Sequence, residues 1–137
     1  MINKFCKKPL WECTIKLAKV AGGAEKADLV IKNARLVNVC THEIMENISV
    51  AVADGRIALV GDAEHCIGEN TKVIDAENKY LAPAFMDGHI HIESSMLTVG
   101  EYAKAVVAHG TSGVFIDPHE ICNVLARFSS SRYQYAS

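Results

Sequence analysis

The sequence has 137 residues, and its 14 Lys and Arg against 16 Asp and Glu give a formal net charge of −2. Half of the residues are apolar and 22% are charged, which is typical of a globular chain and excludes intrinsic disorder of the whole chain. No stretch carries a cluster of Lys and Arg of the kind that binds nucleic acid. No apolar run is long enough to span a membrane. We therefore expect one small domain, or part of a larger one, with neither nucleic acid nor membrane as its partner.

The sequence has five cysteines, an odd number, and no two of them have the C-x-x-C spacing. This pattern indicates reduced thiols rather than a disulfide framework or a thiolate zinc site. Lys, Pro and Glu interrupt the apolar residues near the N-terminus, so the continuous core of a signal peptide is missing. We therefore expect a cytoplasmic protein.

Residues 9–21 are predicted to form a short packing helix, within an N-terminal helical segment over residues 1–26. Pro9 suits the first helical position, and Gly22 and Gly23 end the helix. The residues expected to share its packed face are Leu10, Thr14, Leu17 and Ala21.

From Ala27 the apolar residues recur with a period of two, which predicts strands at 29–31, 35–39, 48–53, 56–60, 72–75 and 79–82. Asn33 and Ala34 are predicted to form a turn, and Asp54-Gly55 predicts a type I′ hairpin. The last two strands are expected to pair with each other around residues 76–78. Residues 27–82 are thus predicted to form a small antiparallel, sandwich-like β unit.

At Pro83 the pattern changes to a strand over 85–92, a helix over 101–109 and a strand over 113–117. This order predicts a βαβ unit, hence a parallel sheet, within residues 83–125. The residues expected to share a face of the helix are Tyr102, Ala105, Val106 and His109. Residues 126–137 are rich in Ser and contain no acidic residue, and they are either a loose tail or a sequence from another reading frame.

The first chemical signal is Asp87-Gly88-His89-Ile90-His91, at the end of an apolar strand. Because side chains two residues apart in a strand point to the same side, His89 and His91 are expected to present two neighbouring imidazoles. Imidazole is the commonest protein ligand of divalent metals, so the pair predicts a metal site. The alternative is two unrelated histidines.

A second polar cluster, Asp117-Pro118-His119-Glu120, follows the next strand. Because parallel strands end at the same mouth of a sheet, His119 and Glu120 are expected to lie near the histidine pair. They would serve as metal ligands or in proton transfer. Equally, Asp-Pro is common in turns, and the two side chains would then be merely solvated.

His91-Ile92-Glu93 is an H-x-E sequence, half of the signature of the cytidine-type zinc deaminases. The other half, P-C-x-x-C, is absent, which excludes that fold. Ser94 and Ser95 are expected either to line a substrate loop or to cap the following helix.

Residues 81–98, L-A-P-A-F-M-D-G-H-I-H-I-E-S-S-M-L-T, and residues 116–125, I-D-P-H-E-I-C-N-V-L, resemble the adenine deaminase branch of the metal-dependent amidohydrolases. Residues 27–39 are similar to the N-terminal part of the same enzymes. The resemblance covers roughly residues 1–125 and leaves 126–137 unmatched. Ala84 stands where the family usually has Gly.

The resemblance implies an α/β fold, in which an N-terminal antiparallel β unit precedes the first βαβ of an amidohydrolase-type (β/α)₈ barrel. The barrel would be truncated, because a whole one takes about 250 residues. Family members add a Glu, two His and an Asp from later strands. The longer enzyme is expected to be a homo-oligomer, and the 137-residue chain alone is expected to be inactive.

The activity implied by the resemblance is hydrolytic deamination of adenine to hypoxanthine and ammonia by metal-activated water. His89 and His91 would hold Mn²⁺ or Fe²⁺, and their chemistry also suits Zn²⁺. His119 and Glu120 would be catalytic at the edge of the metal, and Glu93, Ser94 and Ser95 would bind substrate. The alternatives are another cyclic-amide amidohydrolase and a non-catalytic fragment.

Overall fold

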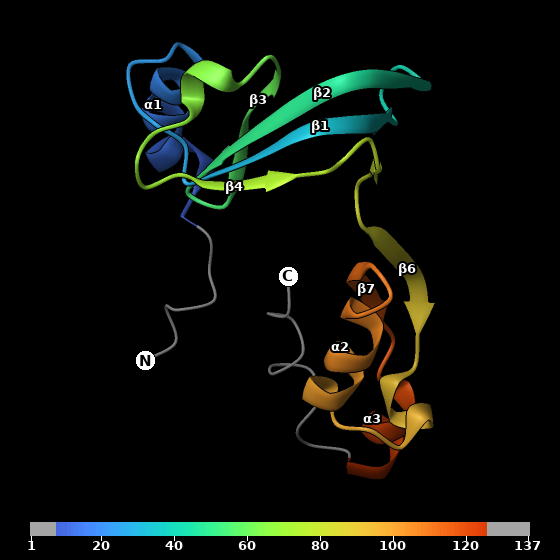
Figure 1. The fold of residues 1–137 in the computed structure, drawn as a ribbon. Helices are drawn as coiled ribbons and strands as arrows, with labels where there is room; N and C mark the ends of the chain where they lie inside the picture. The colour runs from blue at the N-terminus through green and yellow to red at the C-terminus, as the bar shows by residue number, and fades with distance from the viewer. Residues whose placement is uncertain (1–7, 126–137) are drawn as a thin grey trace. The chain divides into compact units, whose positions relative to one another are not determined.

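The computed structural model describes residues 8–125, which form two units divided after Pro83 (Figure 1). The first unit contains α1 (Leu10–Ala21), β1 (Leu29–Asn38), β2 (Glu43–Ala53), β3 (Arg56–Gly61), the 3₁₀ helix η1 (Glu64–Cys66), β4 (Lys72–Asp75) and β5 (Tyr80–Leu81). The second contains β6 (Phe85–Ile90), the 3₁₀ helix η2 (Ile92–Ser95), α2 (Val99–Val107), β7 (Thr111–Ile116) and α3 (His119–Leu125). None of the helices within residues 8–125 has the length and apolar character needed to cross a bilayer. The prediction for residues 126–137 lies outside the described residues.

The sheet of the first unit is mixed rather than antiparallel. Its order is β3-β2-β1-β4, and β5 also pairs with β1. The pairs β1–β2 and β2–β3 are antiparallel, whereas β4 and β5 both run parallel to β1. The predicted pairing of residues 72–75 with 79–82 is therefore wrong. Between β4 and β5 the chain stays bonded to β1, through Ala76 N to Lys32 O at 2.8 Å and Asn78 N to Asn33 O at 2.9 Å, and so it keeps its direction.

A bulge occupies the place in β1 where a turn was predicted. Asn33 adopts a left-handed conformation with φ of 55°, and the register of β1 against β2 shifts between Ile31 and Ala34. The side chain of Asn33 donates a hydrogen bond of 2.9 Å to Asp75 Oδ2 on β4. Asn tolerates this conformation in turns and bulges alike, so the local signal could not distinguish the two.

The predicted hairpin at Asp54-Gly55 is confirmed. Both residues have positive φ, 50° and 69°, as a type I′ turn requires, and they join β2 to β3.

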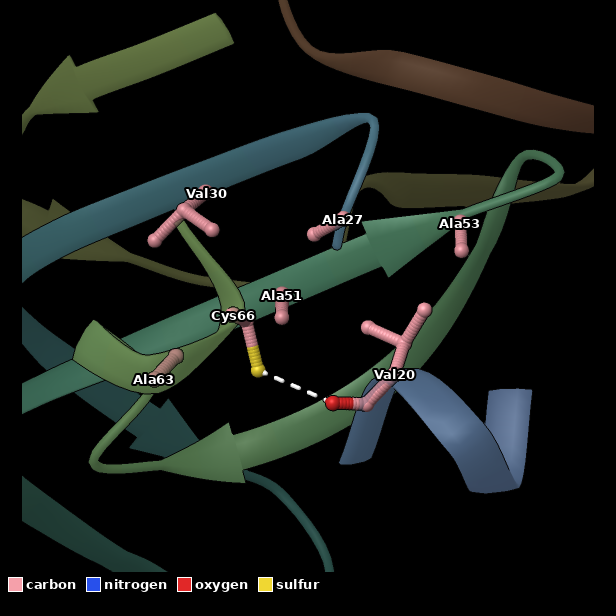
Figure 2. Packing of buried hydrophobic residues seen from close by; sticks show 7 residues of the cluster. All are labelled: Val20, Ala27, Val30, Ala51, Ala53, Ala63 and Cys66. Carbon is pink, nitrogen blue, oxygen red and sulfur yellow. Dashed lines mark hydrogen bonds between the residues drawn. The ribbon is translucent and has the colours of Figure 1, made fainter. Parts of the chain in front are cut away.

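The core of the first unit lies between α1 and one face of the sheet, as Figure 2 shows. From α1 it takes Val20, which is fully buried, with Leu17 packed beside it. The predicted helix face is therefore wrong in part, because Leu10 is 58% exposed and Thr14 is exposed as well. The Cys66 thiol donates a hydrogen bond of 3.2 Å to Val20 O, and burial raises the pKa of this thiol.

Lys16 links α1 to the hairpin. Its Nζ lies 3.0 Å from Asp54 Oδ1 and 3.3 Å from Asp28 Oδ1, and Asp54 N donates to Asp28 Oδ2 at 2.7 Å. The hydrogen bond from Lys16 lowers the pKa of Asp54, and the same bond raises the pKa of Lys16.

Asp54→Asn is expected to lower the stability of the chain at pH 7, while Asn keeps the left-handed turn. A carboxyl whose folded-state pKa is depressed stabilises the fold above its unfolded pKa of about 3.9, and loses that contribution as pH falls through the lower folded pKa. The difference in denaturant midpoint between wild type and variant, measured at a series of pH values, should therefore disappear in acid. The exposed Glu69→Gln is the control, and a gap that is independent of pH would contradict the assignment.

In the second unit β6 and β7 pair in parallel with α2 between them in the chain, so the predicted strand–helix–strand order is confirmed. The helix begins at Val99 because Thr98 is its N-cap, whose Oγ1 accepts from Glu101 N at 3.4 Å. Capping by Ser94 or Ser95 is therefore wrong. Tyr102 and Val106 are half-buried, whereas Ala105 and His109 are exposed, so the predicted helix face is wrong in part.

Candidate metal centre

The histidine pair lies where β6 ends. The predicted strand over 85–92 is too long, because β6 stops at Ile90 and His91 directly precedes η2. The two imidazoles nevertheless lie together, with ring centroids 4.8 Å apart and the Nε2 atoms 2.9 Å apart. Ile92, which follows the pair, is buried, with only 4% of its surface exposed. The expected pairing of His89 with His91 is therefore confirmed.

The orientation of His91 is determined by the neighbouring strand. Asp117 N donates to Ile90 O at 3.0 Å, which brings the backbone of Asp117 alongside His91. His91 Nδ1 lies 2.7 Å from Asp117 O, and because a carbonyl only accepts, Nδ1 carries the proton. In the neutral imidazole with this tautomer, His91 Nε2 carries the lone pair that a metal ligand needs, and it lies 2.9 Å from His89 Nε2.

The second polar cluster lies beside the first. The ring centroids of His91 and His119 are 4.5 Å apart, and His119 Nδ1 is 3.1 Å from Asp117 Oδ2. The expectation that the two clusters meet is thus confirmed. His119 and Glu120 do not sit in a turn but form the start of α3, a helix that the sequence analysis did not predict.

Asp117 is the residue of this cluster that the sequence analysis missed. Its carboxylate lies among imidazoles, with Oδ2 also 4.0 Å from His89 Nε2. The hydrogen bond with His119 lowers the pKa of Asp117, and the neighbouring His91 and His89 add to the effect. The Asp-Pro sequence suggested a turn, although the position of Asp117 directly after the strand was a usable signal.

Two overlapping groups of donors result: His89, His91 and Asp117, and His91, His119 and Glu120. Within each group the ligand atoms lie within 4.8 Å of one another. Neutral imidazole nitrogens combined with carboxylate oxygens suit Zn²⁺, Mn²⁺ and Fe²⁺ alike, so the donor set fits a divalent cation.

The three residues predicted to bind substrate lie on η2. Ser94 Oγ donates to Glu120 Oε2 at 2.7 Å, and Ser95 Oγ donates to Ile92 O, so both hydroxyls are engaged within the chain. Glu93 lines a cavity of about 280 Å³ together with Leu97, Pro118 and other residues of η2, α2, β7 and α3. Of the three, Glu93 is the one that lines this cavity.

The cluster is open to solvent within the described part of the chain. The side chains of His89, His119 and Asp117 are 64%, 55% and 48% exposed. Residues 8–125 therefore supply donors but leave them unshielded from water.

No family model matches the chain. An adenine deaminase of Clostridium botulinum is 66% identical over 125 residues, which are 91% of this chain and 21% of that protein. An adenine deaminase of Moorella thermoacetica is 52% identical over 119 residues, 87% of this chain and 20% of that protein. The solved structure of a molinate hydrolase shares the fold, with a TM-score of 0.51 and 22% identity over 74% of this chain and 28% of that one. The chain is thus homologous to one segment of the adenine deaminases, and it spans about a fifth of their length.

Proposed function

We propose that this chain supplies the first metal-ligating segment of an enzyme that hydrolyses adenine to hypoxanthine and ammonia. The observation that carries the proposal is the 66% identity to the Clostridium botulinum adenine deaminase. A match of 125 residues in a chain of 137 necessarily includes the donor cluster. In this proposal β6, α2 and β7 are the start of a (β/α)₈ barrel, whose active site lies at the carboxyl ends of its strands.

His89 and His91 would hold a divalent cation, either Mn²⁺ or Fe²⁺, with Zn²⁺ equally suited to the donors. Such an ion supplies Lewis-acid activation of water. The carbonyl of Asp117 keeps the proton of His91 on Nδ1 and so presents Nε2 to the ion. Glu120, which accepts a hydrogen bond from the Ser94 hydroxyl, and His119 would take up a proton and return it to the leaving nitrogen. Glu93 would contact adenine from the cavity that it lines.

The 137-residue chain by itself is proposed to lack appreciable turnover. The exposure of His89, His119 and Asp117 favours this view, because hydrolytic metal sites need a shielded cavity. Adenine is the proposed small-molecule partner of the longer enzyme, and a homo-oligomer in the cytoplasm remains its proposed state.

The test places the matched residues of this chain in a longer adenine deaminase. In a chimera, the matching 125 residues of the Clostridium botulinum relative are replaced by those of this chain. The chimera, supplied with Mn²⁺, is expected to release ammonia from adenine, whereas the chain alone is expected to show no turnover.

Turnover of a hydantoin or dihydroorotate instead of adenine would favour the other cyclic-amide hydrolases. A folded chimera without any turnover would contradict the proposal. Turnover by the chain alone would show that the described cluster suffices.

A further inference from the structure

Both the backbone and the side chain of Asp117 face the histidine cluster. The backbone is fixed on two sides, by the bond from Asp117 N to Ile90 O at 3.0 Å and by His91 Nδ1 at 2.7 Å from Asp117 O. These bonds extend the β6–β7 pairing to the residues that follow each strand. The carboxylate is therefore held next to the imidazoles by the sheet itself.

In the described residues, 8–125, this carboxylate lies among imidazoles. Within residues 8–125 the ion-pair partners of Asp117 are imidazoles, His119 at 3.1 Å and His89 at 4.0 Å. One ligand atom from each of Asp117, His89 and His91 lies within 4.8 Å of the other two. A divalent cation held by these three side chains would balance the negative charge of the carboxylate.

We propose that the Asp117 carboxylate is the third protein ligand, beside His89 and His91, of the cation in the candidate metal centre. Three donors would then come from a single strand–helix–strand unit, and the 137-residue chain would bind one cation without any further segment. This inference rests on the proposed metal centre but not on the reaction with adenine.

The alternative role for Asp117 is to orient His119 through the 3.1 Å hydrogen bond, without touching the ion. Either role lowers metal affinity when the carboxylate is removed. They differ in the donor set at saturation, because only direct ligation changes the atoms bound to the metal. The visible absorption of Co²⁺ reports on that donor set.

The experiment titrates the purified 137-residue chain with Co²⁺ and follows the visible spectrum together with the heat of binding. Wild type is expected to bind one Co²⁺. Asp117→Asn is expected to weaken binding by about tenfold or more and to change the spectrum at saturation. Asp117→Glu, which keeps a carboxylate, should restore part of the affinity. The matched control is Asp87→Asn on β6, since Asp87 accepts from His89 N at 3.1 Å and belongs to neither donor group.

Circular dichroism of each variant establishes that it is folded. An Asp117→Asn chain with wild-type affinity would overturn the inference, as would weaker binding with an unchanged spectrum at saturation. Absence of Co²⁺ binding by wild type would overturn it as well. Adenine turnover by the chimera is measured separately, so the inference and the proposed reaction can fail independently.

Discussion

His91→Ala in the chimera is expected to lower kcat/KM for adenine roughly a thousandfold, because several kcal/mol of metal-derived stabilisation corresponds to about three powers of ten in rate. His91 belongs to both donor groups, and its Nδ1 bond to Asp117 O holds it in the ligating tautomer. Ammonia release at saturating Mn²⁺ provides the measurement.

His109→Ala is the matched control, since His109 is an exposed imidazole that follows α2 and lies in neither donor group. It should leave kcat/KM unchanged. Retention of more than a tenth of the activity by His91→Ala would exclude His91 as a metal ligand.

Val30→Asp is expected to unfold the first unit. Val30 is fully buried in the core formed with Val20, Ala51 and Cys66. An uncompensated charge there costs about 3–5 kcal/mol, a large share of the 5–15 kcal/mol typical of whole domains. Loss of the β signal in circular dichroism, together with a lower denaturant midpoint, provides the measurement.

The control is Ile44→Asp on β2, where the side chain is 51% exposed and a carboxylate stays hydrated. This variant should unfold near the wild-type midpoint. Equal losses in the two variants would mean that the charge rather than its burial determines the effect.

The features that were predicted correctly depend on residues that lie close together in the sequence. The Asp54-Gly55 hairpin was predictable because few sequences tolerate two successive positive φ angles. The strand–helix–strand order after Pro83 was predictable because its apolar runs and stop signals lie within one short segment. The βα geometry then correctly placed His119 beside His91.

Features that depend on distant residues were not predictable. Asn33 was predicted to form a turn because no residue near it in the sequence indicates that β4 and β5 both pair with β1, one before the bulge and one after it. The packed face of α1 depends on which sheet positions hold small alanines, such as Ala51 and Ala53. The sequence analysis left a turn at Asp117 open and did not name its carboxylate as a site residue, because its significance comes from His89 and His91, which precede it by more than 25 residues.

The parallel placement of β4 and β5 on β1 has a consequence for the order in which the chain is completed during synthesis. The β2–β3 hairpin lies on one edge of β1 and is finished at Gly61, whereas the other edge waits for residues 72–81. While a ribosome adds those residues, β1 presents an open row of backbone groups, the kind of edge through which nascent chains associate. Emergence of Leu81 closes that row, so one edge of β1 stays open to mispairing during the interval of translation between Gly61 and Leu81.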